Sequence, residues 1–318
     1  MAIEQQVRAL IGAGRQADAV ALVEREAAGG DTWSQFCLAQ WKLQGQGVPL
    51  DVAGAVAWLE RASAAGMAQA SMALTTFYAT GTGCSENPER ARELLQSLRS
   101  NVGFAEAQMR VLEQVVEPQD IRFETLSETP LVRIYRGVLA PVESRSIREL
   151  AEPLLEPSFV IDPASGRRIP HPVRTSTGMS FGPLGENLVI NRINRRIARL
   201  TGTEYAWAEP LHVLRYTPGQ QYRAHVDALP GVSNQRKLTA ILFCNQGFEG
   251  GETAFPQIGL EVRGNEGDML LFANTLPDGR SDPASEHAGL PVTAGEKWIA
   301  TRWIRQRRYH PWEPETAR

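Results

Sequence analysis

Cysteine is scarce in this chain of 318 residues. The three cysteines, Cys37, Cys84 and Cys244, are widely spaced and odd in number. They therefore suit neither a disulfide framework nor a CxxC metal knuckle, and we interpret them as small buried side chains in a reducing compartment. This interpretation favours a cytoplasmic protein.

Long hydrophobic runs and an excess of charge of one sign are also missing. No stretch of about 18 or more apolar residues occurs, so a membrane span is not expected. The first segment, MAIEQQVRALIGAGRQ, has an early acidic residue and no long apolar core, which argues against a secretory signal. The formal net charge is −3 without a block of like charge, so neither a nucleic-acid groove nor a membrane-surface face is predicted.

The N-terminal part of the chain is rich in alanine at helical spacing, and it repeats itself. At an offset of 36 residues, Ala19 aligns with Ala55 and Ala91, and Leu38 aligns with Leu74. A period of this length with two helical segments per unit predicts a solenoid of stacked helix pairs. Small alanines allow neighbouring helices to approach, while larger apolar residues fill the space between them.

Glycines occur where one predicted helix gives way to the next: GQG at 45–47 returns as GTG at 81–83. Together with GQGVPLDVAGAVAWLERASAAGMAQA, this pattern resembles the Sel1-like branch of the tetratricopeptide superfamily. The resemblance covers two and a half to three repeats within residues 1–115 and implies a module that binds proteins or peptides. An amphipathic helical bundle with accidental periodicity is the alternative.

Residues 116–318 follow a different pattern. Two helices are predicted, in PVESRSIRELAEPLL and in NLVINRINRRIARLTG. Short strand-like runs separated by turn residues occur in TLSETPLVRIYRGVL, EPLHVLRYTP, KLTAILFCN, IGLEVRG, GDMLLFAN and EKWIATRWIRQ. We therefore expect an α+β chain of two domains, in which an antiparallel sandwich or barrel with flanking helices follows the solenoid.

His225 and Asp227 stand two residues apart in YTPGQQYRAHVD. Successive side chains of a strand point to opposite faces, so an imidazole and a carboxylate at this spacing share one face and could share a cation. This pair alone is a weak signal. A second histidine, His287, is followed ten residues later by Lys297.

Lys297 begins a predicted strand in which it shares a face with Ile299, Thr301 and Trp303. A buried ammonium is unfavourable without a counter-ion, and this face of the strand carries no acid, so an anionic ligand is the expected partner. Two histidines and one carboxylate form the facial triad of iron(II) oxygenases. A zinc hydrolase could use the same ligands, but it would not need the lysine.

The C-terminal part resembles the catalytic domain of prolyl 4-hydroxylases, which are iron(II)- and 2-oxoglutarate-dependent dioxygenases. The segments that carry the resemblance follow in order: RTSTGMSF, AEPLHVLRYTPGQQYRAHVD, KLTAILFCN, FEGGETAFP, EGDMLLFAN, PDG and HAGLPVTAGEKWIATRWIR. The resemblance implies a double-stranded β-helix, which is a distorted jelly roll. It also implies hydroxylation of a C–H bond coupled to decarboxylation of 2-oxoglutarate to succinate, with O2 consumed and ascorbate as a possible further requirement.

The resemblance assigns roles to residues of this chain. The implied iron ligands are His225, Asp227 and His287. Lys297 matches the residue that pairs with the far carboxylate of 2-oxoglutarate, and the other co-substrate residues are Tyr216, Tyr222 and Thr239. The implied substrate groove contains Arg236 and Trp303. Phe243 stands where some related hydroxylases have a tyrosine, so the co-substrate contacts are expected to depend more on the lysine and the threonine.

Other polar features receive a structural interpretation. His171, His212 and His310 have no ligand-like neighbours, and the EGGE cluster at 249–252 is predicted to be a turn between strands. The leading functional hypothesis is hydroxylation of a prolyl residue in a protein or peptide that the helical repeats recruit. The alternatives are hydroxylation of another residue or a small molecule, and an interaction scaffold whose oxygenase domain is inert.

Overall fold

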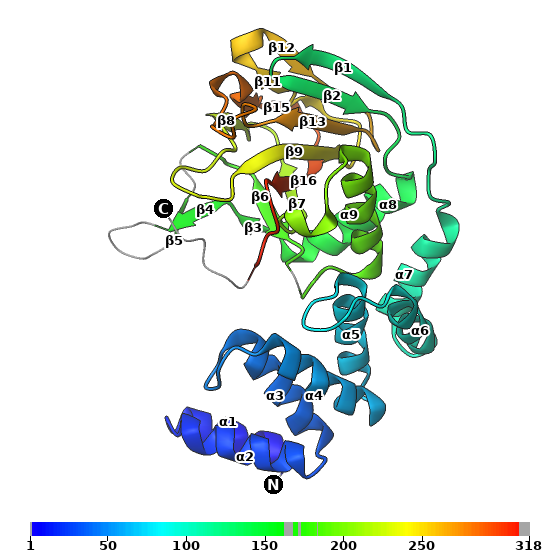
Figure 1. The fold of residues 1–318 in the computed structure, drawn as a ribbon, viewed down its shortest axis with the longest axis vertical. Helices are drawn as coiled ribbons and strands as arrows, with labels where there is room; N and C mark the ends of the chain where they lie inside the picture. Colours follow the sequence, from blue (N-terminus) through cyan, green and yellow to red (C-terminus); the bar gives the residue numbers. More distant parts are fainter. Residues whose placement is uncertain (1, 162–167, 171–172, 183, 312–318) are drawn as a thin grey trace. The chain divides into compact units, whose positions relative to one another are not determined.

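The computed structural model describes residues 2–161, 168–170, 173–182 and 184–311 (Figure 1). His171 lies outside these residues. The chain divides into two compact units: one extends to Glu113 and includes a short later segment ending at Asn191, and the other starts at Gln114. Among the described residues, no helix has both the length and the apolar character needed to cross a membrane.

The first unit is built from helices that follow one another along the chain. They are α1 (Ile3–Gly12), α2 (Gln16–Ala28), α3 (Thr32–Gln44), α4 (Val52–Ala64), α5 (Ala68–Thr80), α6 (Pro88–Leu98) and α7 (Gly103–Gln114). The 36-residue offset places α2, α4 and α6 in equivalent positions, so each begins one helix pair of the predicted solenoid.

Burial explains the repeat that the sequence shows. Ala19, Ala55 and Ala91 lie on α2, α4 and α6, and each has no exposed surface. Such positions leave room only for a methyl group where two helices approach. Gly45 and Gly81 end α3 and α5 in the left-handed region, with φ of 63° and 67°, where a side chain would be strained. The predicted helix pairs and their glycine breaks are confirmed.

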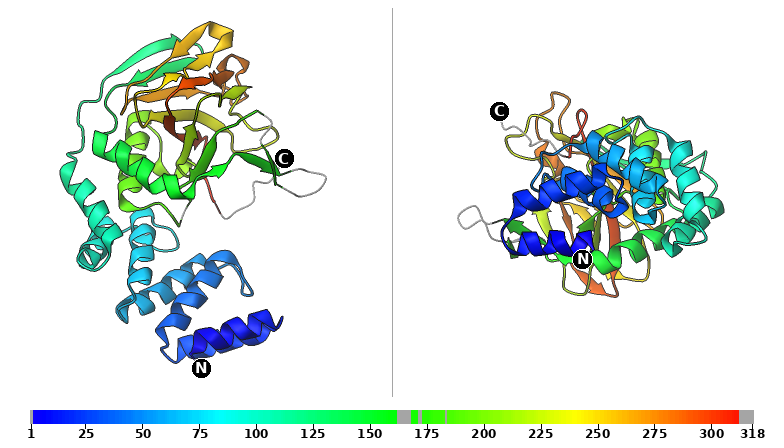
Figure 2. Two further views of the ribbon diagram at one scale, coloured as in Figure 1. Left: turned by 180° about the vertical axis from the view of Figure 1, so that it is seen from behind. Right: turned by 90° about the horizontal axis from the view of Figure 1, so that it is seen from below.

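The second unit contains two sheets that enclose one core. The main sheet has eight strands in the order β1-β2-β13-β9-β16-β7-β6-β3, and a smaller sheet has the order β12-β11-β14-β8. Their strands come from distant parts of the chain and lie side by side (Figures 1 and 2). The short pairs β10-β15 and β4-β5 complete the described strands.

The strand bounds are as follows. The main sheet contains β1 (Phe123–Glu128), β2 (Leu131–Tyr135), β3 (Glu156–Pro157), β6 (Thr177–Ser180), β7 (His212–Tyr216), β9 (Arg236–Phe243), β13 (Met269–Ala273) and β16 (Lys297–Arg305). The smaller sheet contains β8 (Tyr222–His225), β11 (Thr253–Phe255), β12 (Leu260–Val262) and β14 (His287–Gly289). The remaining strands are β4 (Phe159–Ile161), β5 (Arg168–Pro170), β10 (Glu249–Gly250) and β15 (Val292–Ala294).

The core of this unit lies between the two sheets. Leu214, Ile241 and Ile299 contribute from the main sheet, and Phe255 and Val262 contribute from the smaller one. Alternation along each strand sends these side chains inward. Two facing antiparallel sheets of this kind form the expected jelly roll.

Helices α8 (Pro141–Ala151) and α9 (Leu188–Thr201) accompany the main sheet and match the two helices predicted from sequence (Figure 1). A buried ion cluster joins them. Glu143 of α8 has no exposed surface and accepts hydrogen bonds from the guanidinium groups of Arg196 and Arg192 on α9. The guanidinium of Arg196 also donates two hydrogen bonds to the carboxylate of Glu117, near the start of this unit. The ion cluster therefore joins the segment that contains Glu117 to both helices.

Candidate metal centre and co-substrate pocket

Two histidines face each other on neighbouring strands of the smaller sheet. His225 ends β8, His287 begins β14, and the antiparallel register pairs them directly. Their ring centroids lie 4.3 Å apart. Phe255 and Phe272 pack against the ring of His287, with centroids 5.8 Å and 4.5 Å away, so this ring is held by the core.

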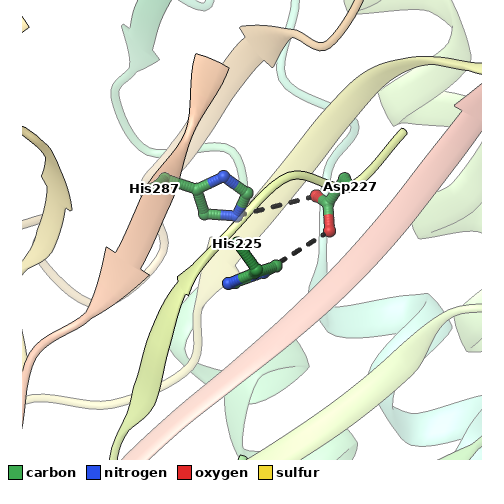
Figure 3. Close-up of side chains that lie close together, drawn as sticks. All are labelled: His225, Asp227 and His287. Atoms are coloured by element: carbon green, nitrogen blue, oxygen red, sulfur yellow. Dashed lines mark ion pairs between the residues drawn. The ribbon is translucent and has the colours of Figure 1, made fainter. Parts of the chain in front are cut away.

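Asp227 completes the cluster from a position that the sequence did not predict. The strand β8 ends at His225, so Asp227 lies beyond it and not on its face as expected. The carboxylate nevertheless turns toward both rings (Figure 3). Oδ1 is 3.6 Å from Nε2 of His225, and Oδ2 is 3.7 Å from Nε2 of His287. One potential ligand atom from each of the three residues lies within 4.8 Å of the others.

Backbone carbonyls orient both imidazoles. Nδ1 of His225 lies 2.8 Å from the Arg223 carbonyl oxygen, and Nδ1 of His287 lies 3.0 Å from that of Ser285. Because a carbonyl only accepts, each Nδ1 carries the proton and each Nε2 presents a lone pair toward the cluster. This is the arrangement that metal-bound histidines need.

The electrostatics of the cluster agree with a cation site. Burial lowers the pKa of His287, which keeps its imidazole neutral and able to donate a lone pair. Burial also opposes the charge of Asp227, but the facing imidazoles hold its pKa below the ordinary range, so the carboxylate is ionised. Two imidazoles and one carboxylate form a ligand set that fits iron(II) and leaves further coordination positions open.

Lys297 lies in the same pocket as the cluster. The pocket lining includes Ile299, Thr301 and Trp303, which confirms the shared face predicted for β16. Lys297 is 2% exposed, and its ammonium donates a 2.6 Å hydrogen bond to the Gly251 carbonyl oxygen. Burial lowers the pKa of Lys297 to about 8. An anionic ligand would favour its charged form.

Tyr216 and Tyr222 both line this pocket, as the sequence predicted. Tyr216 pairs with Lys297 across β7 and β16, and the ammonium lies 5.6 Å from the centre of its ring. Tyr222 stacks on His225 with ring centroids 3.5 Å apart. Burial raises the pKa of both hydroxyl groups, so both remain protonated donors.

Thr239 lines the pocket but also contacts the cluster directly. Its hydroxyl donates a 2.6 Å hydrogen bond to Oδ2 of Asp227. The sequence predicted only a contact with the co-substrate. The side-chain amide of Asn274, which sequence reasoning missed, donates to the same hydroxyl at 2.8 Å. Asn274 follows the last residue of β13 directly, and nothing in the sequence around it marks it as a partner of Thr239.

The two residues predicted for a substrate groove contact each other. The guanidinium of Arg236 lies 4.0 Å from the ring centre of Trp303, which lines the pocket. Glu209 holds Arg236 through hydrogen bonds of 2.6 Å and 2.8 Å, and it also lies 2.6 Å from Nε of Arg305. Glu209 was not predicted, because its contacts join strands far apart in the sequence. The groove role of Arg236 and Trp303 stays a prediction.

The remaining predictions have mixed outcomes. His310 is exposed, whereas His212 is partly buried, with its ring stacked against Trp303 and hydrogen-bonded to Ser180. Burial lowers the pKa of His212 to about 3. A structural role for His212 is consistent with this. The turn predicted at 249–252 is shorter than expected, because Glu249 and Gly250 form strand β10, which pairs with β15. Only Gly251 and Glu252 connect β10 to β11, and Gly250 and Gly251 both have positive φ. Phe243 is buried in the core and does not belong to the pocket lining.

Comparison with known proteins agrees with both units. A family model of the 2OG-Fe(II) oxygenase superfamily matches residues 211–305, and Sel1 repeats match 34–67 and 66–98. Prolyl 4-hydroxylase 1 of Arabidopsis thaliana is 33% identical over 207 residues, which covers 59% of this chain and 73% of that protein. Probable prolyl 4-hydroxylase 10 of the same plant is 34% identical over 210 residues, covering 58% and 72%.

Among solved structures, a viral collagen prolyl hydroxylase from Paramecium Bursaria Chlorella virus-1, in complex with 2OG, is 28% identical. It covers 55% of this chain and 95% of the viral chain, with a TM-score of 0.44. The residues that the oxygenase family model matches, 211–305, include His225, Asp227, His287 and Lys297. The chain belongs to the prolyl 4-hydroxylase family of iron(II)- and 2-oxoglutarate-dependent oxygenases, and it carries Sel1 repeats before its oxygenase domain.

Proposed function

We propose that this protein hydroxylates a prolyl residue in a protein or peptide. The reaction uses iron(II), O2 and 2-oxoglutarate and yields succinate and carbon dioxide. The observation that carries the proposal is the cluster of His225, Asp227 and His287 in one pocket with the buried ammonium of Lys297. The names of the plant relatives support proline as the target.

Some residues of the pocket bind the metal, and others bind the co-substrate. His225, Asp227 and His287 hold iron(II), which supplies the oxidising chemistry when bound. Lys297 neutralises the far carboxylate of 2-oxoglutarate, in a charge-assisted bond that replaces its contact with Gly251. The protonated hydroxyls of Tyr216 and Tyr222 act as further donors in the same pocket.

The pocket walls exclude water and orient the two organic reactants. Leu214, Ile241 and Ile299 give the pocket an apolar lining beside the charged groups. Electrostatic contacts are stronger in such surroundings than in water, and side reactions with water are reduced. Trp303, with Arg236 against its ring, contributes to the groove for the target peptide.

Three further features belong to this proposal. The Sel1 repeats recruit the protein that carries the target residue, since stacked helix pairs expose extended binding surfaces. Ascorbate sustains the reaction by keeping the iron reduced. The location is cytoplasmic, which the three free cysteines support.

A turnover assay tests the proposed reaction. The protein is incubated with iron(II), 2-oxoglutarate, ascorbate and a library of proline-containing peptides in air. We expect succinate together with the mass gain of one oxygen atom, assigned by fragmentation to proline. Asp227→Asn serves as the inactive control, and Glu149→Gln, an exposed change outside the pocket, serves as the active one.

The outcomes separate the hypotheses. If the oxygen atom is found on a residue other than proline, or if succinate forms only with a small molecule, prolyl specificity is contradicted. Either result would still support the oxygenase activity. Failure of the protein to bind or consume 2-oxoglutarate in the presence of iron(II) would contradict the catalytic role itself. Removing the repeats is informative only for the full-length protein substrate, where we expect KM to rise and kcat to persist.

A further inference from the structure

A hydrogen-bond relay connects the main sheet to the carboxylate of the metal cluster. Asn274, which follows β13, donates through Nδ2 to the Thr239 hydroxyl on β9 at 2.8 Å. The Thr239 hydroxyl donates to Oδ2 of Asp227 at 2.6 Å. The two histidines belong to the smaller sheet, so the relay joins the cluster to the opposite side of the core.

The direction of the relay follows from the number of protons. A threonine hydroxyl has one proton, and an ionised carboxylate only accepts. The proton of Thr239 must therefore point to Asp227, which leaves the hydroxyl oxygen to accept from Asn274. If the Asn274 amide were turned over, its carbonyl would require a second proton from the same hydroxyl. The carboxylate thus fixes both the hydroxyl and the amide.

Both relay residues are held rigidly. Thr239 and Asn274 have no exposed surface, so water does not compete for their hydrogen bonds. The backbone of Asn274 is bonded on both sides: its N–H donates to the Lys237 carbonyl, and its carbonyl accepts from the N–H of Asp282. The side-chain oxygen Oδ1 of Asn274 has no hydrogen-bond partner among the described residues. A buried acceptor without a partner destabilises the fold, so a contribution to stability alone does not explain why an asparagine stands at this position.

We propose that Thr239 and Asn274 are positioning residues for the metal-binding carboxylate. The Thr239 hydroxyl sets the rotation of the Asp227 carboxylate, and Asn274 sets the hydroxyl. Asp227 needs this support because it lies beyond the end of β8, where no ladder hydrogen bonds restrain it. The inference rests on the proposed role of Asp227 as an iron ligand.

The relay makes a prediction that differs from a co-substrate role for Thr239. Outer partners that orient a metal ligand change metal affinity by about 10- to 100-fold when they are removed. A contact with 2-oxoglutarate would change only the affinity for the co-substrate. Binding of the metal alone, without 2-oxoglutarate, therefore isolates the relay.

The experiment is a titration of the full-length protein with Mn(II), followed by electron paramagnetic resonance of the free ion, without 2-oxoglutarate. Thr239→Val removes the hydroxyl and keeps the branched shape, while Thr239→Ser keeps the hydroxyl. Thr301→Val is the matched control, because Thr301 lines the same pocket, is 4% exposed and bonds none of the three cluster residues in the described structure. Thermal unfolding of each metal-free variant monitors the fold.

We expect T239V to weaken Mn(II) binding by about 10- to 100-fold, while T239S and T301V remain within about threefold of the unmodified protein. Wild-type affinity in folded T239V overturns the inference. An equal loss in T239S or T301V also overturns it, because packing and not the hydroxyl would then be responsible. If T239V does not fold, Asn274→Ala decides: several-fold weaker binding supports the relay, and unchanged binding contradicts it.

The same titration separates this inference from the proposed function. If the unmodified protein binds no Mn(II), the metal site itself is contradicted. If it binds Mn(II) and T239V binds equally well, only the relay fails. Prolyl specificity does not enter either result.

Discussion

His225 and His287 are directly opposite each other on β8 and β14, and each turns its Nε2 toward Asp227. They are separated by 62 residues in the chain, and the antiparallel pairing of two short strands brings them together. The distance between the rings is therefore set by strand pairing, which is stiff. Paired strands therefore keep the two histidines at this spacing without the ion.

Replacement of the carboxylate tests the cluster. In Asp227→Asn, a neutral amide replaces the one formal negative charge among the three residues, so we expect affinity for Mn(II) or Co(II) to fall by more than about 100-fold, beyond the loss from an outer partner. Metal titration by absorbance or magnetic resonance measures this. Retention of wild-type affinity would mean that the cluster is not the metal site.

Lys297→Ala tests the co-substrate pocket. The change removes a charge-assisted hydrogen bond worth about 1.5–3 kcal/mol, so we expect 2-oxoglutarate to bind about 10- to 100-fold more weakly. Metal affinity should stay unchanged, since no cluster residue loses a partner. Calorimetric titration of 2-oxoglutarate into the Mn(II)-loaded protein checks the first result. Loss of metal with unaltered co-substrate binding would contradict the assignment.

The same lysine predicts a pH dependence. Burial lowers the pKa of Lys297 to about 8, so the free pocket holds an ammonium below that pH and a neutral amine above it. Affinity for 2-oxoglutarate should therefore fall as pH rises through this value, by about tenfold for each further unit. The co-substrate affinity of Lys297→Arg, whose guanidinium stays charged, should be flat over the same range. A similar fall in both proteins would point to another group.

The buried ion cluster between α8 and α9 predicts a large stability effect. Glu143→Gln leaves the buried guanidinium of Arg196 with one carboxylate partner in place of two, and we expect a loss of about 3–5 kcal/mol in the free energy of unfolding. Glu149→Gln, on an exposed face of the same helix, should change it by less than about 0.5 kcal/mol. Denaturant unfolding of both variants provides the comparison, and equal effects would contradict the role of the cluster.

The helical repeats offer a matched pair of core and surface leucines. Leu59 is 1% exposed and Leu50 is 46% exposed. Leu59→Ala should destabilise the first unit by about 2–5 kcal/mol, because it removes buried methyl groups and leaves a cavity. Leu50→Ala should be nearly neutral. Circular dichroism during thermal unfolding of the full chain checks this, and an equal response of the two variants would be evidence against the repeat packing.

The sequence predicted much of the architecture because the relevant signals are local. Ala19, Ala55 and Ala91 revealed the helix pairs through their spacing, and alternation along β16 predicted the face shared by Lys297 and Trp303. Asp227 shows the limit of such reasoning. Alternation along a strand suggested that Asp227 shares a face with His225, but β8 stops at His225, so the acid reaches the cluster from beyond the strand.

Contacts between distant strands stayed invisible to sequence reasoning. The resemblance assigned Thr239 to the co-substrate, and the structure adds a hydrogen bond from its hydroxyl to Asp227 that was not predicted. Neither Asn274 nor Glu209 was predicted. These side chains contact their partners only after distant strands have paired, so their spacing in the sequence does not reveal the contacts.

The chain's own residue order determined which groups are available: two imidazoles, a carboxylate and an ammonium, along with the periods of helix and strand. Tertiary structure alone decided how they are held, through the carbonyls that orient each imidazole and the hydroxyl that orients the carboxylate. The physical reason is the difference in sequence range between the two kinds of interaction. Backbone periodicity acts over a few residues, while a hydrogen bond forms between any two groups that folding brings within about 3 Å.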